Sequence, residues 1–229
     1  MKVFEMTAIQ VRIYAEDTIP YHLLLRPNSI QMIAERFGFQ HQDVPFPILA
    51  PGAPKVLNFL TGELKVDDRQ FIIEQLNFEN RKISLRVKGS TDGVNLVFEA
   101  ILTTLKDICP GYDFEESKVI LRTDQTECVV QLEIDFLSFF SQKFRKYYKS
   151  TLPLHLPNKP EMIIPKKLSL EISFFQPKEF RGYNVSLSPK LFTIEPRTNT
   201  RLEDKVFLTQ SPCSSETHLK ILKEIEELF

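Results

Sequence analysis

The chain has 229 residues, 42% of them hydrophobic and 26% charged, which is typical of a globular protein that buries a large core without disulfides or metals. Its formal net charge of −1 at pH 7 lacks the positive excess with which proteins usually bind a phosphate backbone. Nucleic acid is therefore a disfavoured partner.

The cysteines indicate a reducing compartment. Cys109, Cys128 and Cys213 are odd in number and far apart in the sequence, so we predict three free thiols. The first twenty residues alternate and carry charges, without the apolar run of a signal peptide. No stretch approaches the roughly 18 apolar residues that a membrane span needs. These features predict a cytoplasmic protein without a transmembrane segment.

Catalytic and cofactor-binding motifs are not recognisable in the sequence. The seven glycines are scattered, whereas loops that hold phosphates need clustered glycines for the backbone to approach the anion. The four histidines show no spacing typical of metal ligands, and no hydrolase, protease or P-loop signature occurs. We therefore predict no catalytic residues, no metal and no cofactor.

The first half of the chain predicts strands and two helices. Alternating apolar residues predict a strand over 3–13, and a second apolar run predicts a strand over 21–26. A short helix should follow, capped by Asn28 or Ser29 and ended by Gly38. Beyond a proline-rich loop, the pattern predicts strands at 56–64, 71–78 and 83–87 and an amphipathic helix at 93–108.

The second half begins with a predicted strand pair, 118–122 with 128–134, which turns around Asp124 and leads into a helix at 136–149. A proline-rich linker follows. The remaining pattern predicts a last helix over 215–229, preceded by strands at 168–174, 183–187, 191–194 and 205–208.

This order of elements predicts the fold class. Strands joined by short polar turns imply an α+β fold with predominantly antiparallel sheets and amphipathic helices packed on one face. Residues 55–108 and 166–229 both read as three strands followed by a helix, which suggests a duplicated unit. The proline-rich linker divides the chain into an N-terminal lobe, 1–152, and a C-terminal lobe, 153–229, which we expect to pack as one body.

A candidate anion site lies where a strand opens through glycines into a helix. Gly89, Ser90, Thr91 and Gly93 could present free backbone amides at the helix N-terminus. However, Asp92 would place a carboxylate where the anion should bind, and Thr91 and Asp92 are also ordinary capping residues. Capping is therefore the alternative explanation.

The predicted helix at 136–149 is the most asymmetric segment. One face is aromatic, and the other carries the cations Lys143, Arg145, Lys146 and Lys149 together with Phe139. Such a helix can bind a membrane surface, an acidic protein or a nucleic-acid strand, or it can pack on the core with a solvated lysine face. The near-neutral charge of the chain favours an acidic protein surface among the functional alternatives, with Phe139 as the apolar anchor.

These observations predict a non-catalytic interaction or scaffold subunit that acts through protein–protein contacts, either by forming a homo-oligomer or within a larger complex. The alternative is a small-molecule-binding protein or an atypical enzyme with a site in the cleft between the two lobes.

Overall fold

The computed structural model describes residues 1–15, 19–44, 56–66, 68–112, 114, 118–156, 160, 163–173 and 188–229. Within these residues, nine strands form one antiparallel sheet in the order β2-β3-β4-β5-β1-β6-β9-β8-β7. The strands are β1 (Lys2–Tyr14), β2 (His41–Asp43), β3 (Leu57–Val66), β4 (Arg69–Glu79), β5 (Lys82–Lys88), β6 (Val119–Gln131), β7 (Leu168–Ile172), β8 (Lys190–Pro196) and β9 (Val206–Ser211).

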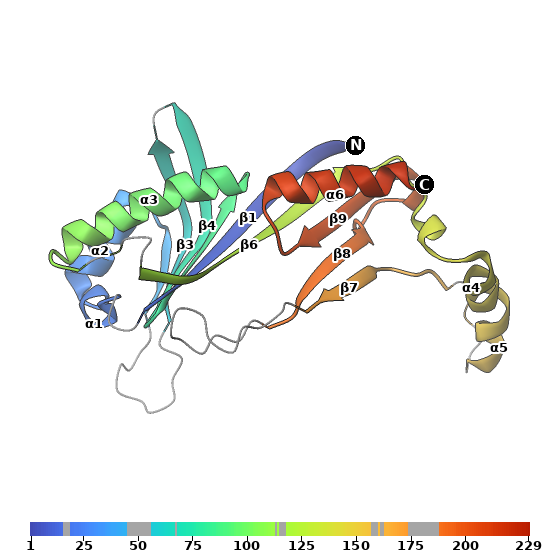
Figure 1. Ribbon diagram of the computed structural model, residues 1–229, viewed down its shortest axis with the longest axis horizontal. Coiled ribbons are helices and arrows are strands. Elements are labelled where there is room, and N and C mark those ends of the chain that lie inside the picture. The colour runs from blue at the N-terminus through green and yellow to red at the C-terminus, as the bar shows by residue number, and fades with distance from the viewer. Residues whose placement is uncertain are drawn as a thin grey trace.

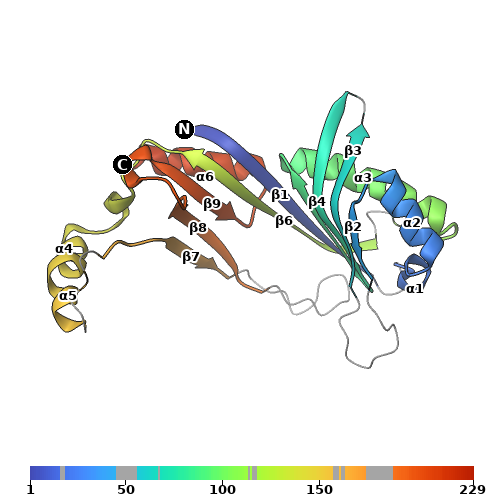
Figure 2. The ribbon, with the colours of Figure 1, turned by 180° about the vertical axis from the view of Figure 1, so that it is seen from behind.

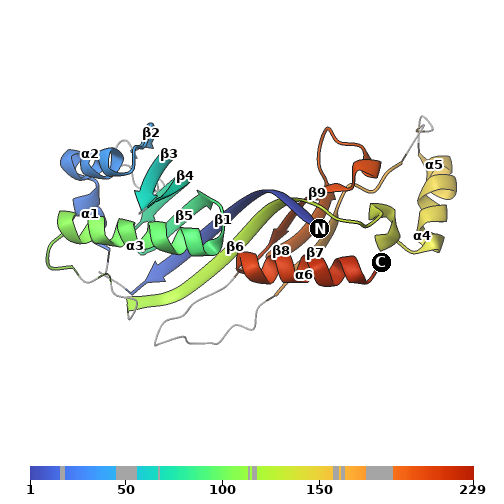
Figure 3. The ribbon, with the colours of Figure 1, turned by 90° about the horizontal axis from the view of Figure 1, so that it is seen from above.

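The two long helices lie on one face of this sheet. They are α3 (Thr91–Ile108) and α6 (Ser215–Glu227), and they follow one another end to end over the central strands (Figure 3). Seen from behind, the strands lie in front of both helices, and no described helix covers this second face (Figure 2). The shorter helices are α1 (Tyr21–Leu24), α2 (Pro27–Arg36), α4 (Gln142–Lys146) and α5 (Leu152–His155). The predicted α+β class, with helices on one face of an antiparallel sheet, is therefore confirmed.

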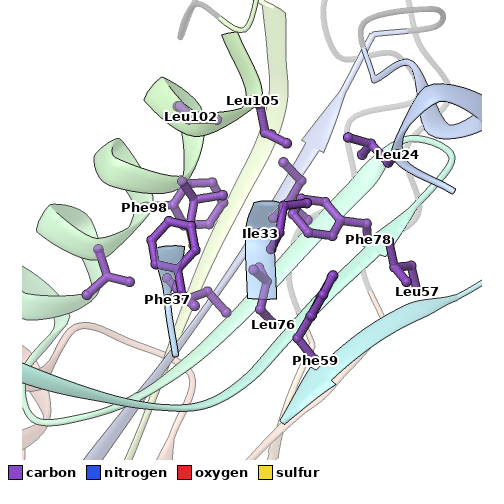
Figure 4. Packing of buried hydrophobic residues seen from close by; sticks show 14 of the residues in the cluster. Leu24, Ile33, Phe37, Leu57, Phe59, Leu76, Phe78, Phe98, Leu102 and Leu105 are labelled. Carbon is purple, nitrogen blue, oxygen red and sulfur yellow. The ribbon is translucent and has the colours of Figure 1, made fainter. Parts of the chain in front are cut away.

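Two apolar clusters fill the space between helices and sheet. The larger lies beneath α1, α2 and α3, where Phe98, Leu105 and Phe78 are completely buried (Figure 4). The smaller lies beneath α6 and includes Leu222 and Phe207. In α3 the apolar residues recur every three or four positions, so one stripe of the helix faces the sheet and its burial stabilises the fold.

The sheet has an internal two-fold symmetry. Ala8 of β1 is opposite Thr126 of β6; Ala8 is also opposite Val87 of β5, and Thr126 is opposite Ser211 of β9. An axis through the Ala8–Thr126 pair therefore exchanges β1 with β6, β5 with β9, β4 with β8, and β3 with β7. The three strands before α3 correspond to the three before α6, which supports the duplicated unit expected from the sequence.

The helix N-termini meet at this axis. The backbone N–H of Thr91 donates to the Ser215 side-chain oxygen at 3.1 Å, and the N–H of Ser215 donates to the Thr91 side-chain oxygen at 3.3 Å. The preceding residues act alike, because Ser90 and Ser214 each accept a hydrogen bond from the N–H three residues later. The reciprocal contact joins the two halves of the molecule.

Three predicted elements differ from the structure, and one of them, the helix over 136–149, is described with the candidate site below. The expected strand pair turning at Asp124 is instead one uninterrupted strand, β6, because both β1 and β9 pair along it. The expected strand at 21–26 contains the short helix α1, where Leu24 is buried in the larger apolar cluster. Tertiary burial outweighs the strand preference of this apolar run. The strand expected at 183–187 lies outside the described residues.

The lobes expected from the linker share one sheet. β6 of the N-terminal lobe pairs with β9 of the C-terminal lobe over six residue pairs. The two-fold repeat begins its second copy at β6, so its halves do not coincide with the lobes 1–152 and 153–229, whose boundary stays a prediction.

Candidate functional site

The cations singled out in the sequence lie on a projection from the body. Residues 142–156, which we call the basic arm, comprise α4, a π-helical turn (Tyr147–Thr151) and α5. Figure 1 shows this arm beyond the end of the sheet that carries β7, β8 and β9. The arm is joined to β6 through a single turn of 3₁₀ helix, Phe136–Phe139.

Two capping residues interrupt the helix that we predicted over 136–149. Asp135 accepts a hydrogen bond from the N–H of Leu137 at 3.0 Å and starts the 3₁₀ turn. Ser141 accepts one from the N–H of Phe144 at 3.2 Å and starts α4. Between them Phe140 has an extended backbone. The chain therefore changes direction at Phe140, before the arm begins, and 136–149 is not the single helix with two faces that the sequence predicted.

Phe139 consequently does not lie on the basic side of a helix. Its side chain is half-buried against the smaller apolar cluster, and its ring centroid lies 5.9 Å from that of Phe136 and 4.9 Å from that of Phe229. The structure places Phe139 at the root of the arm, where it helps to attach the arm to the core.

The four predicted cations do lie together. Lys143, Arg145, Lys146 and Lys149 line a hollow of about 530 Å³. The three lysines are exposed, and none of the four cations forms an ion pair with a described carboxylate. The Nε atom of Arg145 is buried and has no hydrogen-bond acceptor among the described residues. The hollow is therefore a concentrated positive surface that can accept an anionic group.

Exposed apolar side chains border the cations. Phe144 is 48% exposed, Tyr147 46% and Leu154 70%. Tyr148 is buried, and a stack of rings from Phe140 through Phe144 to Tyr148, with centroids 5.8 and 5.6 Å apart, holds α4 in place. The arm thus offers aromatic and aliphatic contacts beside its charges, which is the residue combination of a protein-binding surface.

The candidate anion site is occupied by the protein's own groups. Ser90 caps α3 through Gly93, and the N–H of Thr91 is already bonded to Ser215. Thr91 is only 5% exposed. Gly89 has a φ of 121°, which favours glycine at the bend between β5 and α3. These contacts favour the capping alternative, so we do not include Gly89, Ser90, Thr91 and Gly93 in the proposal below.

The described cysteines have environments that suppress reactivity. Burial raises the pKa of Cys109 and of Cys213, and it raises the pKa of Cys128 to about 12. The thiolate is the reactive form, so these shifts act against nucleophilic chemistry. Among the residues that the structure describes, no three His, Cys, Asp or Glu side chains are close enough to hold a metal ion.

A second hollow lies between the two lobes defined by the linker. It measures about 690 Å³ and is lined from one lobe by Leu137 and Tyr148, and from the other by Ile163, Ile164 and the loop 200–203. Its size and its mixture of apolar and charged walls match those of small-molecule pockets.

Sequence reasoning found the cations and the aromatic residues of this segment but not which of the rings are exposed beside the cations. It assigned the anchor to Phe139, whereas the exposed rings beside the cations are those of Phe144 and Tyr147. The signal was present in the two capping residues, Asp135 and Ser141, which indicate two short helices with a break between them.

Comparison of this chain with protein-family models, curated proteins and solved structures gives no match. Within the described residues, no helix combines the length and the apolar character needed to cross a bilayer. The geometry of the chain itself therefore carries the functional argument.

Proposed function

We propose that this chain is a non-catalytic interaction subunit of the cytoplasm, which binds an acidic protein surface through its basic arm. The observation that carries the proposal is the set of four cations around one hollow, without acidic partners among the described residues and beside exposed Phe144 and Tyr147. Unpaired cations repel one another, and an acidic partner would relieve that repulsion.

The uncovered face of the sheet argues against nucleic acid as the partner. Residues directly opposite in antiparallel strands share a face, so this face carries Arg86 beside two carboxylates, Glu74 at 2.7 Å and Glu127 at 2.6 Å. Lys82 is likewise paired with Glu79. Both cations are paired within the protein, so neither of them extends the positive surface of the arm.

The proposal can be tested by reversing the three exposed lysines, Lys143→Glu, Lys146→Glu and Lys149→Glu, in one variant. The probe is fluorescent poly-L-glutamate, which presents acidic groups on a polypeptide backbone. Binding should be lost in the variant and should weaken with salt in the wild type, since screening acts over roughly 10 Å at 0.1 M. Folding should be retained, because surface charges seldom change stability by more than about 0.5 kcal/mol.

A matched control variant separates the effect of the arm's lysines on binding from the effect of the total charge. Lys65 of β3, Lys88 of β5 and Lys106 of α3 are exposed and belong to the half of the molecule without the arm, so reversing these three gives the same change in total charge. The control variant should bind poly-L-glutamate about as strongly as the wild type, apart from a weak long-range effect. Equal loss in both variants, or stronger lysine-dependent binding of duplex DNA or anionic vesicles, would contradict the proposal.

The hollow of about 690 Å³ supports a second candidate function, the binding of a small apolar molecule between the lobes. A thermal-shift screen would favour this function if a compound stabilises the wild type but not a variant in which Ile163→Trp fills the hollow.

A further inference from the structure

The internal symmetry reveals an uncovered surface in the second half of the sheet. One row of residues crosses the eight strands from β3 to β7 through the symmetry axis. The β8–β9 register, with Thr193 opposite Gln210, places Phe192 beside Ser211 in this row. The row is Gly62, Ile73, Val87, Ala8, Thr126, Ser211, Phe192 and Leu170. Gly62 of β3 and Leu170 of β7 therefore occupy equivalent positions.

These equivalent positions have opposite surroundings. A Cβ atom added at Gly62 would lie 2.5 Å from the ring of Phe39 and 2.7 Å from the carbonyl oxygen of Phe37, because the residues that follow α2 lie directly on β3. Leu170 is 54% exposed, and its neighbour on the same face, Ile172, is 37% exposed. The first half thus has a layer of structure over its outer strand that the second half lacks among the residues described there.

The chain connectivity identifies the segment that corresponds to this layer. In the first half, α1 and α2 lie between β1 and β3 in sequence; in the second half, the basic arm lies between β6 and β7. The arm does not cover β7 but extends beyond the end of the sheet (Figure 1). Its own apolar side chains, Phe144, Tyr147 and Leu154, are exposed there. The uncovered strand and the uncovered arm carry complementary apolar surfaces.

The charges are complementary as well. In the first half, Arg36 of α2 pairs with Asp107 of α3 at 2.9 Å. In the second half, the arm carries its three exposed lysines, and the C-terminal end of α6 exposes Glu227 and Glu224, the latter paired with Lys220 at 3.9 Å. An arm that reached the C-terminal end of α6 would therefore find Glu227 there, as α2 finds Asp107 on α3.

We infer that the partner of the basic arm is a second copy of this chain: two copies exchange their arms, each covering β7 and the acidic end of α6 in the other. This inference rests on the proposed function and names its partner. The exchange is reciprocal, so it closes into a two-fold dimer and leaves no free arm to extend the assembly. It also protects an outer strand that otherwise exposes apolar residues.

The test is the solution mass of the full chain, measured by sedimentation over a range of concentrations. The wild type should form a dimer. Leu170→Ser, on the strand, and the double variant Tyr147→Ser with Leu154→Ser, at two exposed side chains of the arm, should each raise the dimer dissociation constant at least about tenfold. The control Ile72→Ser, at a side chain that is 45% exposed on β4, should leave that constant unchanged.

Mixing the two variants gives the decisive result. The arm of the strand variant and the strand of the arm variant are both intact, so one contact of the two can form, and the mixture should contain a heterodimer. A wild type that is monomeric at every concentration would overturn the inference, as would a dimer insensitive to both variants or a mixture without heterodimer. Loss of folding in the strand variant would leave the arm variant, whose changes lie outside the core, to decide.

The same experiment distinguishes the two proposals. A monomeric wild type that still binds poly-L-glutamate through its lysines would refute the second copy as partner and leave the proposed function standing. A wild type that neither dimerises nor binds poly-L-glutamate would refute both.

Discussion

His218 is a buried polar residue at a position where the first half of the molecule is apolar. By the symmetry that matches Thr91 with Ser215, His218 corresponds to Val94, and its partner Thr209 corresponds to Leu85. The Nε2 atom of His218 lies 2.8 Å from the Thr209 hydroxyl oxygen, which also donates to the carbonyl of Cys128 at 3.3 Å. These contacts favour the tautomer in which Nε2–H donates to Thr209.

Burial lowers the pKa of His218 from 6.5 to about 4, because the charged ring would lose its hydration. The folded state therefore prefers the neutral ring, and the unfolded state binds the proton first as the pH falls. The contribution of neutral His218 to the free energy of unfolding should be fully present above pH 6.5. It should be lost between about pH 6.5 and pH 4, where it lowers the free energy of unfolding by roughly 3 kcal/mol in all.

A variant can isolate this contribution. Thr209→Leu combined with His218→Val copies the apolar pair of the first half and removes the titrating group. Between pH 7 and pH 5, the wild type should lose about 2 kcal/mol more than the variant, as measured by urea unfolding. Equal losses would show that His218 is not held neutral by the fold.

At the scale of elements, the contact of α2 with β3 distinguishes the two halves. Phe37 and Phe39 are buried, and Gly62 lets them approach the strand. Gly62→Ala should cost about 1–3 kcal/mol, because the added methyl group overpacks a close backbone contact. Ile72→Ala, on the adjacent strand but exposed, should cost less than about 1 kcal/mol in the same denaturation experiment. Similar costs for the two changes would contradict close packing of α2 on β3.

The elements also show what the sequence could predict. The period of apolar residues located α3, α6 and the strands β3, β4 and β5, because local periodicity and burial agree there. It failed at β6, where Asp124 resembled a turn residue. The side chain of Gln10 on β1 donates to Asp124 at 2.8 Å, so a partner 114 residues away keeps this polar residue within a strand. No local pattern contains that information.

The candidate site was predicted in part for the same reason. A run of cations is visible in the sequence, so Lys143, Arg145, Lys146 and Lys149 were found. The exposure of a side chain depends on the path of the backbone. Because the predicted helix is interrupted at Phe140, Phe139 does not lie among the cations, and its assignment as the anchor is not supported. The uncovered face of β7 could not be predicted either, because it is defined only by comparison with β3 across the symmetry axis.

At the scale of the whole molecule, the asymmetry between the halves has functional consequences. The two halves share a central strand pair and a reciprocal contact between helices, yet within the described part of the chain only the first half is covered over its outer strand. β2, at the other edge of the sheet, is a three-residue strand with exposed polar side chains, which suits an edge that remains free. The edge at β7, with Leu170 and Ile172 exposed, is suited to being covered.

Hydrogen–deuterium exchange of the wild type at increasing protein concentration tests this account most directly. Association through exchanged arms predicts that protection increases in two segments, the arm at 142–156 and β7 at 168–172, while exchange in α2 and β3 stays constant. These segments come from opposite sides of the same contact, so they should become protected over the same concentration range. The account is contradicted if exchange in both segments is independent of concentration, or if protection develops elsewhere while the arm and β7 remain unprotected.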